Sequence, residues 1–91
     1  MNSFKRNPEV SQTALGEETF LVAPDSGEVY YLDAVTSGLW RLLAEPQSIS
    51  ECQAAYRDAF PDQPAERIDR DVAAAIATLL ERKLIVPAGQ Q

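Results

Sequence analysis

Few residues of this chain can do chemistry. The sequence has no histidine and one cysteine, Cys52, so neither a Ser-His-Asp nor a Cys-His arrangement can be built. A structural zinc site, which needs about four Cys or His ligands, is excluded as well. Cys52 falls between Ile49 and Tyr56 on an apolar helical stripe, which favours core packing over reactivity. We therefore expect a protein that is not an enzyme and that holds no metal or cofactor.

Two other patterns have both a structural and a functional interpretation. Ser26, in Asp25-Ser26-Gly27, resembles the Asp-Ser dipeptide that carries phosphopantetheine in acyl carrier proteins. It falls in an expected hairpin turn, however, whereas a carrier presents its serine at a helix N-terminus. The carboxylates of residues 66–71 interleave with arginines at helical spacings of three and four. This spacing predicts a solvated face with ion pairs rather than a metal site.

Length and charge limit the class of protein. The 91 residues fit a single domain over 1–91, with an ordered core of about 9–86 and loose termini. Fourteen acidic against eight basic residues give a formal charge of −6, which argues against nucleic acid and against an anionic membrane surface. We expect the acidic residues to be spread over solvent faces and helix starts. One cysteine, no long apolar stretch and no apolar run after Lys5 and Arg6 predict a cytoplasmic location.

The first third of the sequence predicts a small antiparallel sheet. Residues 19–23 and 28–32 are short and rich in strand formers, and 24–27 reads Pro-Asp-Ser-Gly, a turn sequence. A hairpin follows from this arrangement. Residues 9–14 alternate weakly and could add a third strand.

The rest of the sequence predicts three helices. Asp33 is a suitable N-cap for 34–44, where Gly38 would permit close packing. Ser48 and Glu51 form a capping box for a second helix, which ends before Pro61. The third helix covers about 65–83 and is followed by a short apolar segment, 84–86, that could be extended. The fold class is therefore α+β and winged helix-turn-helix-like, with two or three N-terminal strands before three helices.

This order of elements raises a DNA-binding winged helix as one interpretation. In the third expected helix, four cations are cancelled by four carboxylates, and the second has a net negative charge. Neither helix has the basic surface that DNA binding requires. An acidic winged-helix transcription regulator is kept as the alternative function.

A set of ordered motifs resembles the PqqD-like peptide chaperones, also called RiPP recognition elements (elements that recognise ribosomally synthesised, post-translationally modified peptides). The resemblance covers about residues 19–86. Its motifs are Leu32-Asp33, Leu39-Trp40, Leu42-Leu43, Ser48-Ile49-Ser50-Glu51, Tyr56, Phe60, Ile68-Asp69-Arg70-Asp71-Val72, Leu79, Leu80 and Lys83-Leu84-Ile85. Two positions depart from the pattern: Asp33 stands where Asn is commoner, and Lys83 stands where Gly is common.

The resemblance implies a chaperone that binds the leader of a precursor peptide and presents it to a modifying enzyme such as a radical SAM protein, a protease or a cyclase. The leader would add a strand beside 28–32, against the N-terminal half of the third helix. Adjacent residues of a strand face opposite sides, so only one of two neighbouring tyrosines can join the core. The implied peptide-binding residues are Glu28, Val29, Tyr30, Tyr31, Leu32, Arg67, Arg70, Ala73, Ala74 and Ala77, with the two arginines pairing with acidic leader side chains.

Overall fold

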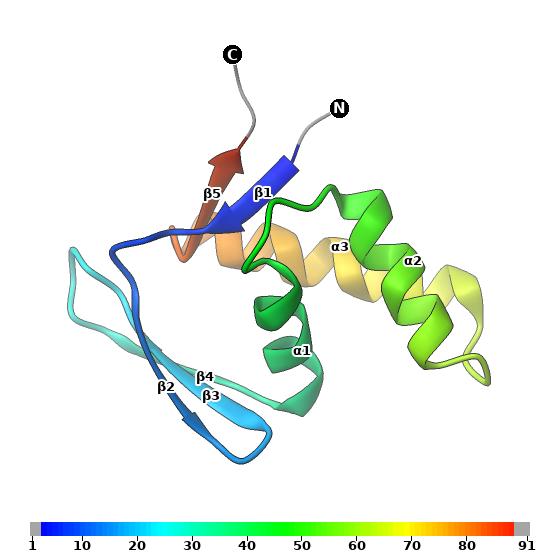
Figure 1. Cartoon of the computed structure of the whole chain (residues 1–91), viewed down its shortest axis with the longest axis horizontal. Coiled ribbons are helices and arrows are strands. Elements are labelled where there is room, and N and C mark those ends of the chain that lie inside the picture. Colours follow the sequence, from blue (N-terminus) through cyan, green and yellow to red (C-terminus); the bar gives the residue numbers. More distant parts are fainter. Residues whose placement is uncertain (1–2, 89–91) are drawn as a thin grey trace.

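The computed structural model describes residues 3–88, which form two small antiparallel sheets and three helices (Figure 1). This confirms the expected winged-helix-like α+β class. The strands are β1 (Ser3–Arg6), β2 (Ser11–Leu15), β3 (Glu18–Val22), β4 (Val29–Leu32) and β5 (Ile85–Ala88). The helices are α1 (Ala34–Leu42), α2 (Ile49–Ala59) and α3 (Ala65–Glu81).

The larger sheet has the strand order β2-β3-β4, so β2 and β4 are its edges. The β3–β4 register pairs Leu21 with Tyr30, and both side chains contact the core. The turn between these strands contains Gly27, whose φ of 74° lies in the left-handed region that glycine adopts readily. The turn is closed by a hydrogen bond from the Gly27 N–H to the Ala23 carbonyl oxygen at 3.0 Å.

The second sheet is a correction to the expected ordered core of 9–86. β1 pairs with β5 in a register that joins Ser3 to Ala88, so paired structure extends beyond both expected boundaries. The Phe4 N–H also donates to the Gln47 carbonyl oxygen at 2.8 Å, which ties β1 to the α1–α2 connection. The expected loose segment 87–91 is therefore wrong for 87 and 88, whereas 89–91 lie outside the described residues. The β1 sequence, Ser-Phe-Lys-Arg, is short and shows no apolar–polar alternation, so it does not predict a strand. Its partner β5 is also far away in the sequence, so no local turn indicates the pairing.

Local capping accounts for two helix starts, as expected. The Asp33 carboxylate accepts the Thr36 N–H at 2.8 Å, and the Ser48 hydroxyl and Glu51 carboxylate form a complete capping box. The end of α3 is less usual. Lys83 has a φ of 60°, and the Leu84 N–H bonds back to the Leu79 carbonyl oxygen, which is a Schellman-type termination. Lys83 thus holds a left-handed conformation that glycine adopts at lower cost.

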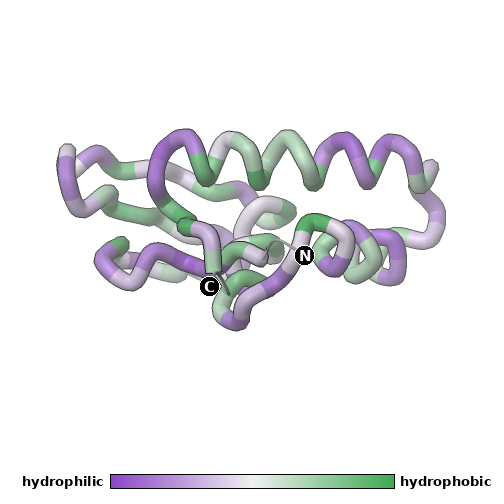
Figure 2. The backbone as a smooth tube through the Cα atoms, turned by 90° about the horizontal axis from the view of Figure 1, so that it is seen from above, coloured by the Kyte–Doolittle hydropathy of each residue, from purple (hydrophilic) through white to green (hydrophobic). Residues whose placement is uncertain are grey.

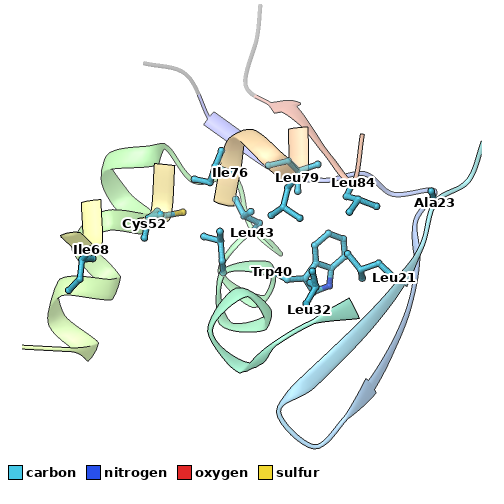
Figure 3. Packing of buried hydrophobic residues seen from close by; sticks show 13 residues of the cluster. Leu21, Ala23, Leu32, Trp40, Leu43, Cys52, Ile68, Ile76, Leu79 and Leu84 are labelled. Carbon is cyan, nitrogen blue, oxygen red and sulfur yellow. The ribbon is translucent and has the colours of Figure 1, made fainter. Parts of the chain in front are cut away.

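The core lies between α3 and the other elements. Figure 2 shows the long helix α3 running along one side of a flat molecule. Trp40 lies at the sheet end of the core, near Leu21 and Leu32 (Figure 3), and its indole N–H donates to the Gln12 side chain at 2.6 Å. Cys52 is completely buried beside α3, which confirms its core role.

Gly38 allows the close packing that the sequence suggested. A Cβ atom at this position would lie 3.1 Å from the Tyr56 hydroxyl oxygen. That hydroxyl donates to the Val35 carbonyl oxygen and so joins α2 to α1. None of the helices within residues 3–88 is long and apolar enough to cross a membrane.

Candidate functional site

A groove of about 270 Å³ lies between β4 and the C-terminal half of α3. Tyr30, Tyr31 and Leu32 line it on the strand side. Ala75, Thr78, Leu79 and Arg82 line it on the helix side. Small and medium side chains on α3 leave room along the strand, so an extended chain can lie there.

The edge of β4 that borders this groove has unpaired backbone groups. Among the strands of residues 3–88, β4 pairs only with β3, and hydrogen-bonded and non-bonded residue pairs alternate along such a ladder. The Ala23 N–H donates to the Glu28 carbonyl oxygen at 2.9 Å, so every second residue from Glu28 onward bonds to β3. The N–H and C=O groups of Val29 and Tyr31 therefore point away from β3, toward the open edge.

The two tyrosines of β4 have different surroundings. Tyr30 is half-buried and packs against the core, whereas Tyr31 is exposed on the opposite face of the sheet beside the Phe20 ring. The Tyr30 hydroxyl donates to the Glu28 carboxylate, and this hydrogen bond, more than burial, raises the pKa of Tyr30. The question of which tyrosine joins the core is settled in favour of Tyr30.

Arg82 supplies a positive charge at the groove. Its guanidinium carbon lies 4.8 Å from the centre of the Tyr30 ring, which is a cation–π distance. Within residues 3–88, the two ion pairs join Arg57 to Asp69 and Arg67 to Asp71, so Arg82 belongs to neither. Its charge therefore remains available to a ligand in the groove.

A second pocket, of about 320 Å³, continues from the groove between the three helices. We call it the helical pocket. It shares Asp33, Thr36 and Ala75 with the groove, so the two spaces are adjacent. Its walls are mainly apolar and include Val35, Leu39, Phe60, Ile68 and Val72.

Half of the residues that line the helical pocket are polar: Asp33, Thr36, Tyr56, Gln63, Arg67 and Asp71. Arg67 and Asp71 lie on its α3 side and form an i, i+4 pair at 3.9 Å between exposed side chains. Tyr56 also lines the pocket, and burial raises the pKa of its hydroxyl to about 12. Most of the exposed surface of the pocket is nevertheless apolar, so it suits an apolar side chain with polar groups at its border.

The structure brings together only part of the residue set implied by the sequence. Tyr30, Tyr31 and Leu32 line the groove, and Arg67 lines the helical pocket. The remaining six residues line neither space: Glu28, Val29, Arg70, Ala73, Ala74 and Ala77. Val29 contributes backbone groups to the open edge, and Glu28 accepts the Tyr30 hydroxyl. The helix beside β4 is the C-terminal half of α3, not its N-terminal half.

Sequence reasoning missed the residues of α3 and its C-cap that line the groove: Ala75, Thr78, Leu79 and Arg82. Ala75 and Thr78 each precede a buried residue of the stripe Ile68, Val72, Ile76 and Leu79, and so they flank it on one side. Ala73 and Ala77 each follow a buried residue and flank the stripe on the other side. The flank that faces β4 depends on how the helix is packed, which the stripe does not reveal.

The groups considered for covalent or metal chemistry have structural roles. Burial raises the pKa of the Cys52 thiol to about 11, so it is neither an activated nucleophile nor accessible. The Ser26 hydroxyl accepts the Glu28 N–H at 3.2 Å within the hairpin turn. No group of three or more Cys, Asp or Glu side chains that could hold a metal ion occurs in the part of the chain from 3 to 88.

The three-stranded sheet followed by three helices defines the class of the protein: a small winged-helix-like α+β domain with an open strand edge beside a helix. The family model described as Coenzyme PQQ synthesis protein D (PqqD) matches residues 18–85, which is most of the chain. The chain therefore belongs to the PqqD family.

Two solved structures share the fold. One is described as "TbiB1 in Complex with the TbiA(beta) Leader Peptide" and matches with a TM-score of 0.80 and 24% identity over 96% of this chain and 98% of that chain. The other, "Lasso peptide synthetase B1 complexed with the leader peptide", has a TM-score of 0.76 and 21% identity over 92% of this chain and 98% of that chain. A search of curated protein sequences gave no match.

Proposed function

We propose that this protein binds the leader segment of a ribosomally made precursor peptide by adding the leader as a fourth strand to β4. The observation that carries the proposal is the open edge of β4, with the Val29 and Tyr31 backbone groups directed toward a groove whose other wall is α3. Backbone hydrogen bonds along such an edge supply affinity without requiring a particular sequence. Membership of the PqqD family and a fold shared with two leader-bound proteins support the same function.

Specificity would come from the spaces beside the edge. The helical pocket would receive an apolar leader side chain at the end of the groove, because its walls are mainly apolar. Arg82 and Arg67 would pair with acidic leader side chains, Arg82 at the groove and Arg67 at the pocket. Arg70, Ala73, Ala74 and Ala77 stay in the proposal only as neighbours of this site.

The proposed role is presentation rather than catalysis. The bound leader would be delivered to an enzyme that modifies or cleaves the precursor, such as a radical SAM protein, a protease or a cyclase. The site would act in the cytoplasm, where ribosomal peptides are made, and the single unpaired Cys52 suits that reducing compartment. The winged-helix transcription regulator has no observation in its favour, since carboxylates outnumber cations on α3.

The test is a titration of the isotope-labelled protein with a synthetic leader of the precursor encoded beside its gene, followed through backbone amide shifts. We expect the largest shifts at Val29 to Leu32 and at Ala75, Thr78 and Arg82. Shifts confined to β2 or to the β1–β5 sheet would contradict the assignment of the site.

A matched pair of arginine variants tests the role of charge. Arg82→Ala should weaken the binding of a leader with acidic side chains by about 1 kcal/mol, roughly fivefold, because it removes a cation beside the groove. Arg70→Ala removes the same charge from an exposed position of α3 that lines neither space, and it should leave the affinity unchanged. Equal losses in both variants would mean that only the net charge matters.

A further inference from the structure

The outer face of the β2-β3-β4 sheet, which points away from the core, is unusually apolar. Phe20 pairs with Tyr31, and Val22 pairs with Val29, so the two cross-strand pairs form one continuous patch. Leu15 extends it from β2, diagonally across from Phe20. Leu15, Val29 and Tyr31 are 60%, 63% and 54% exposed, which leaves large apolar side chains in contact with water. A contiguous patch of this kind is typical of an interaction surface.

The same sheet carries almost all of the net charge of the chain. Residues 11–33 contain five of the 14 acidic residues and none of the eight basic residues, so they account for −5 of the total charge of −6. The imbalance comes from the missing cations, because the other nine acidic residues lie elsewhere in the chain. Neither of the ion pairs within residues 3–88 includes a carboxylate of this segment. The patch thus has an acidic border with no balancing cation of its own.

This border is placed at the ends and on the face of the sheet. Glu17 and Glu18 lie at the β2–β3 turn, and Asp25 lies at the β3–β4 turn. Glu18 shares the outer face with Leu15, its partner in the register, and its carboxylate raises the pKa of the Tyr31 hydroxyl. Apolar side chains in the middle and carboxylates around them match a partner with the reverse charge at its rim.

We propose that this outer face docks a basic-rimmed apolar surface of the enzyme that receives the leader. A second copy of this chain is the poorer occupant, because two such faces would bring the carboxylates at their borders, Glu17, Glu18 and Asp25, against each other. The position of the face also suits delivery: Val29 and Tyr31 direct their side chains to it, while their backbone groups face the groove. An enzyme on this face would lie directly beside the bound leader. This inference rests on the proposed leader-binding function.

The probe for the test is the purified modifying enzyme encoded beside this chain's gene, and its binding to this chain is measured without leader at low and high salt. The variant Leu15→Thr with Val22→Thr removes apolar area and places β-branched threonines, which suit a strand, at both positions. It should weaken binding of the enzyme roughly tenfold or more. Glu18→Lys should slow association on the order of threefold and reduce its salt dependence. Asp58→Lys makes the same charge change on exposed α2 and should have no effect.

Leader affinity is measured separately on the same variants, so that the two proposals can fail independently. Normal leader binding with lost enzyme binding in the Leu15→Thr, Val22→Thr variant supports the docking face. If the wild-type chain binds leader but that variant binds enzyme as the wild type does, the docking proposal is overturned and leader binding stands. The proposal is also overturned if sedimentation shows a wild-type dimer that the double substitution abolishes, or if enzyme binding is independent of salt.

Discussion

Proline substitutions on β4 give the sharpest test of strand addition. Val29→Pro and Tyr31→Pro each remove one N–H that faces the open edge, and proline is tolerated on an edge strand when its missing N–H faces outward. A backbone hydrogen bond contributes about 1 kcal/mol net, and a leader carbonyl left unpaired in a partly shielded groove costs about 1–3 kcal/mol. Leader affinity should therefore fall roughly 5- to 150-fold for each proline.

The other edge of the sheet provides a matched control. On β2 the N–H of Ala14 faces the opposite open edge. Its partner Thr19 directs its backbone groups to β4, so the hydrogen bonds between β2 and β3 are made by the neighbouring residues Thr13 and Leu15. Ala14→Pro should thus have little effect on leader affinity. Fluorescence anisotropy of a labelled leader measures binding, and near-ultraviolet circular dichroism of the buried Trp40 confirms the fold. The loss of a single hydrogen bond already predicts a weaker complex. Strand addition at this edge would be refuted if both β4 proline variants fold and bind the leader within about twofold of the wild-type affinity.

Three further predictions concern stability, measured by denaturant unfolding. Gly38→Ala should destabilise the protein by about 1 kcal/mol, because the added Cβ meets the Tyr56 hydroxyl at 3.1 Å. In a Tyr56→Phe background the same substitution should stabilise the protein, because alanine has the higher helix propensity. A loss of stability in both backgrounds would contradict the contact with the hydroxyl as the cause. Lys83→Gly should stabilise by about 0.5–1 kcal/mol, since it relieves a left-handed φ of 60°; no change would mean that the backbone there is unstrained. In the folded protein, the pKa of the Cys52 thiol is about 11, above the ordinary value of 9.0. Its contribution to stability is therefore complete below about pH 9 and is lost as the pH rises toward 11. Across that pH window, the free energy of unfolding of the wild type should fall by about 2 kcal/mol more than that of Cys52→Ala. Parallel plots of unfolding free energy against pH for the two proteins would contradict the raised pKa.

The parts of the fold that depend on short sequence separations were predictable from the sequence. The Asp33 cap and the Ser48–Glu51 capping box each involve residues three positions apart, and the structure contains both. The β3–β4 hairpin was predictable for the same reason, because its turn is local. The β1–β5 sheet was not, since it joins Arg6 to Ile85, and neither strand carries a pattern that identifies its partner.

The groove illustrates a second limit of the sequence. The buried stripe of α3 identifies the face that meets the core, but both flanks of the stripe carry small residues. The flank that borders β4 contains Ala75 and Thr78, whereas the one chosen from the sequence contains Ala73 and Ala77. The choice between flanks depends on the rotation of α3 relative to the sheet. That rotation is set by long-range packing, including Leu84 and Ile85, which follow the helix and are almost fully buried.

The register of β4 determines both proposed surfaces at once. A shift of one residue would exchange the backbone groups that face the groove with those that bond to β3, and would also turn the outer side chains inward. The segment 28–32 does not fix this register by alternation, because Tyr30 and Tyr31 are adjacent and alike. The junction with α1 does so instead: the Ser37 hydroxyl donates to the Leu32 carbonyl oxygen at 3.0 Å, and Asp33 caps the helix immediately afterwards. Buried Leu32 and the helix cap thereby position the edge on which leader binding depends.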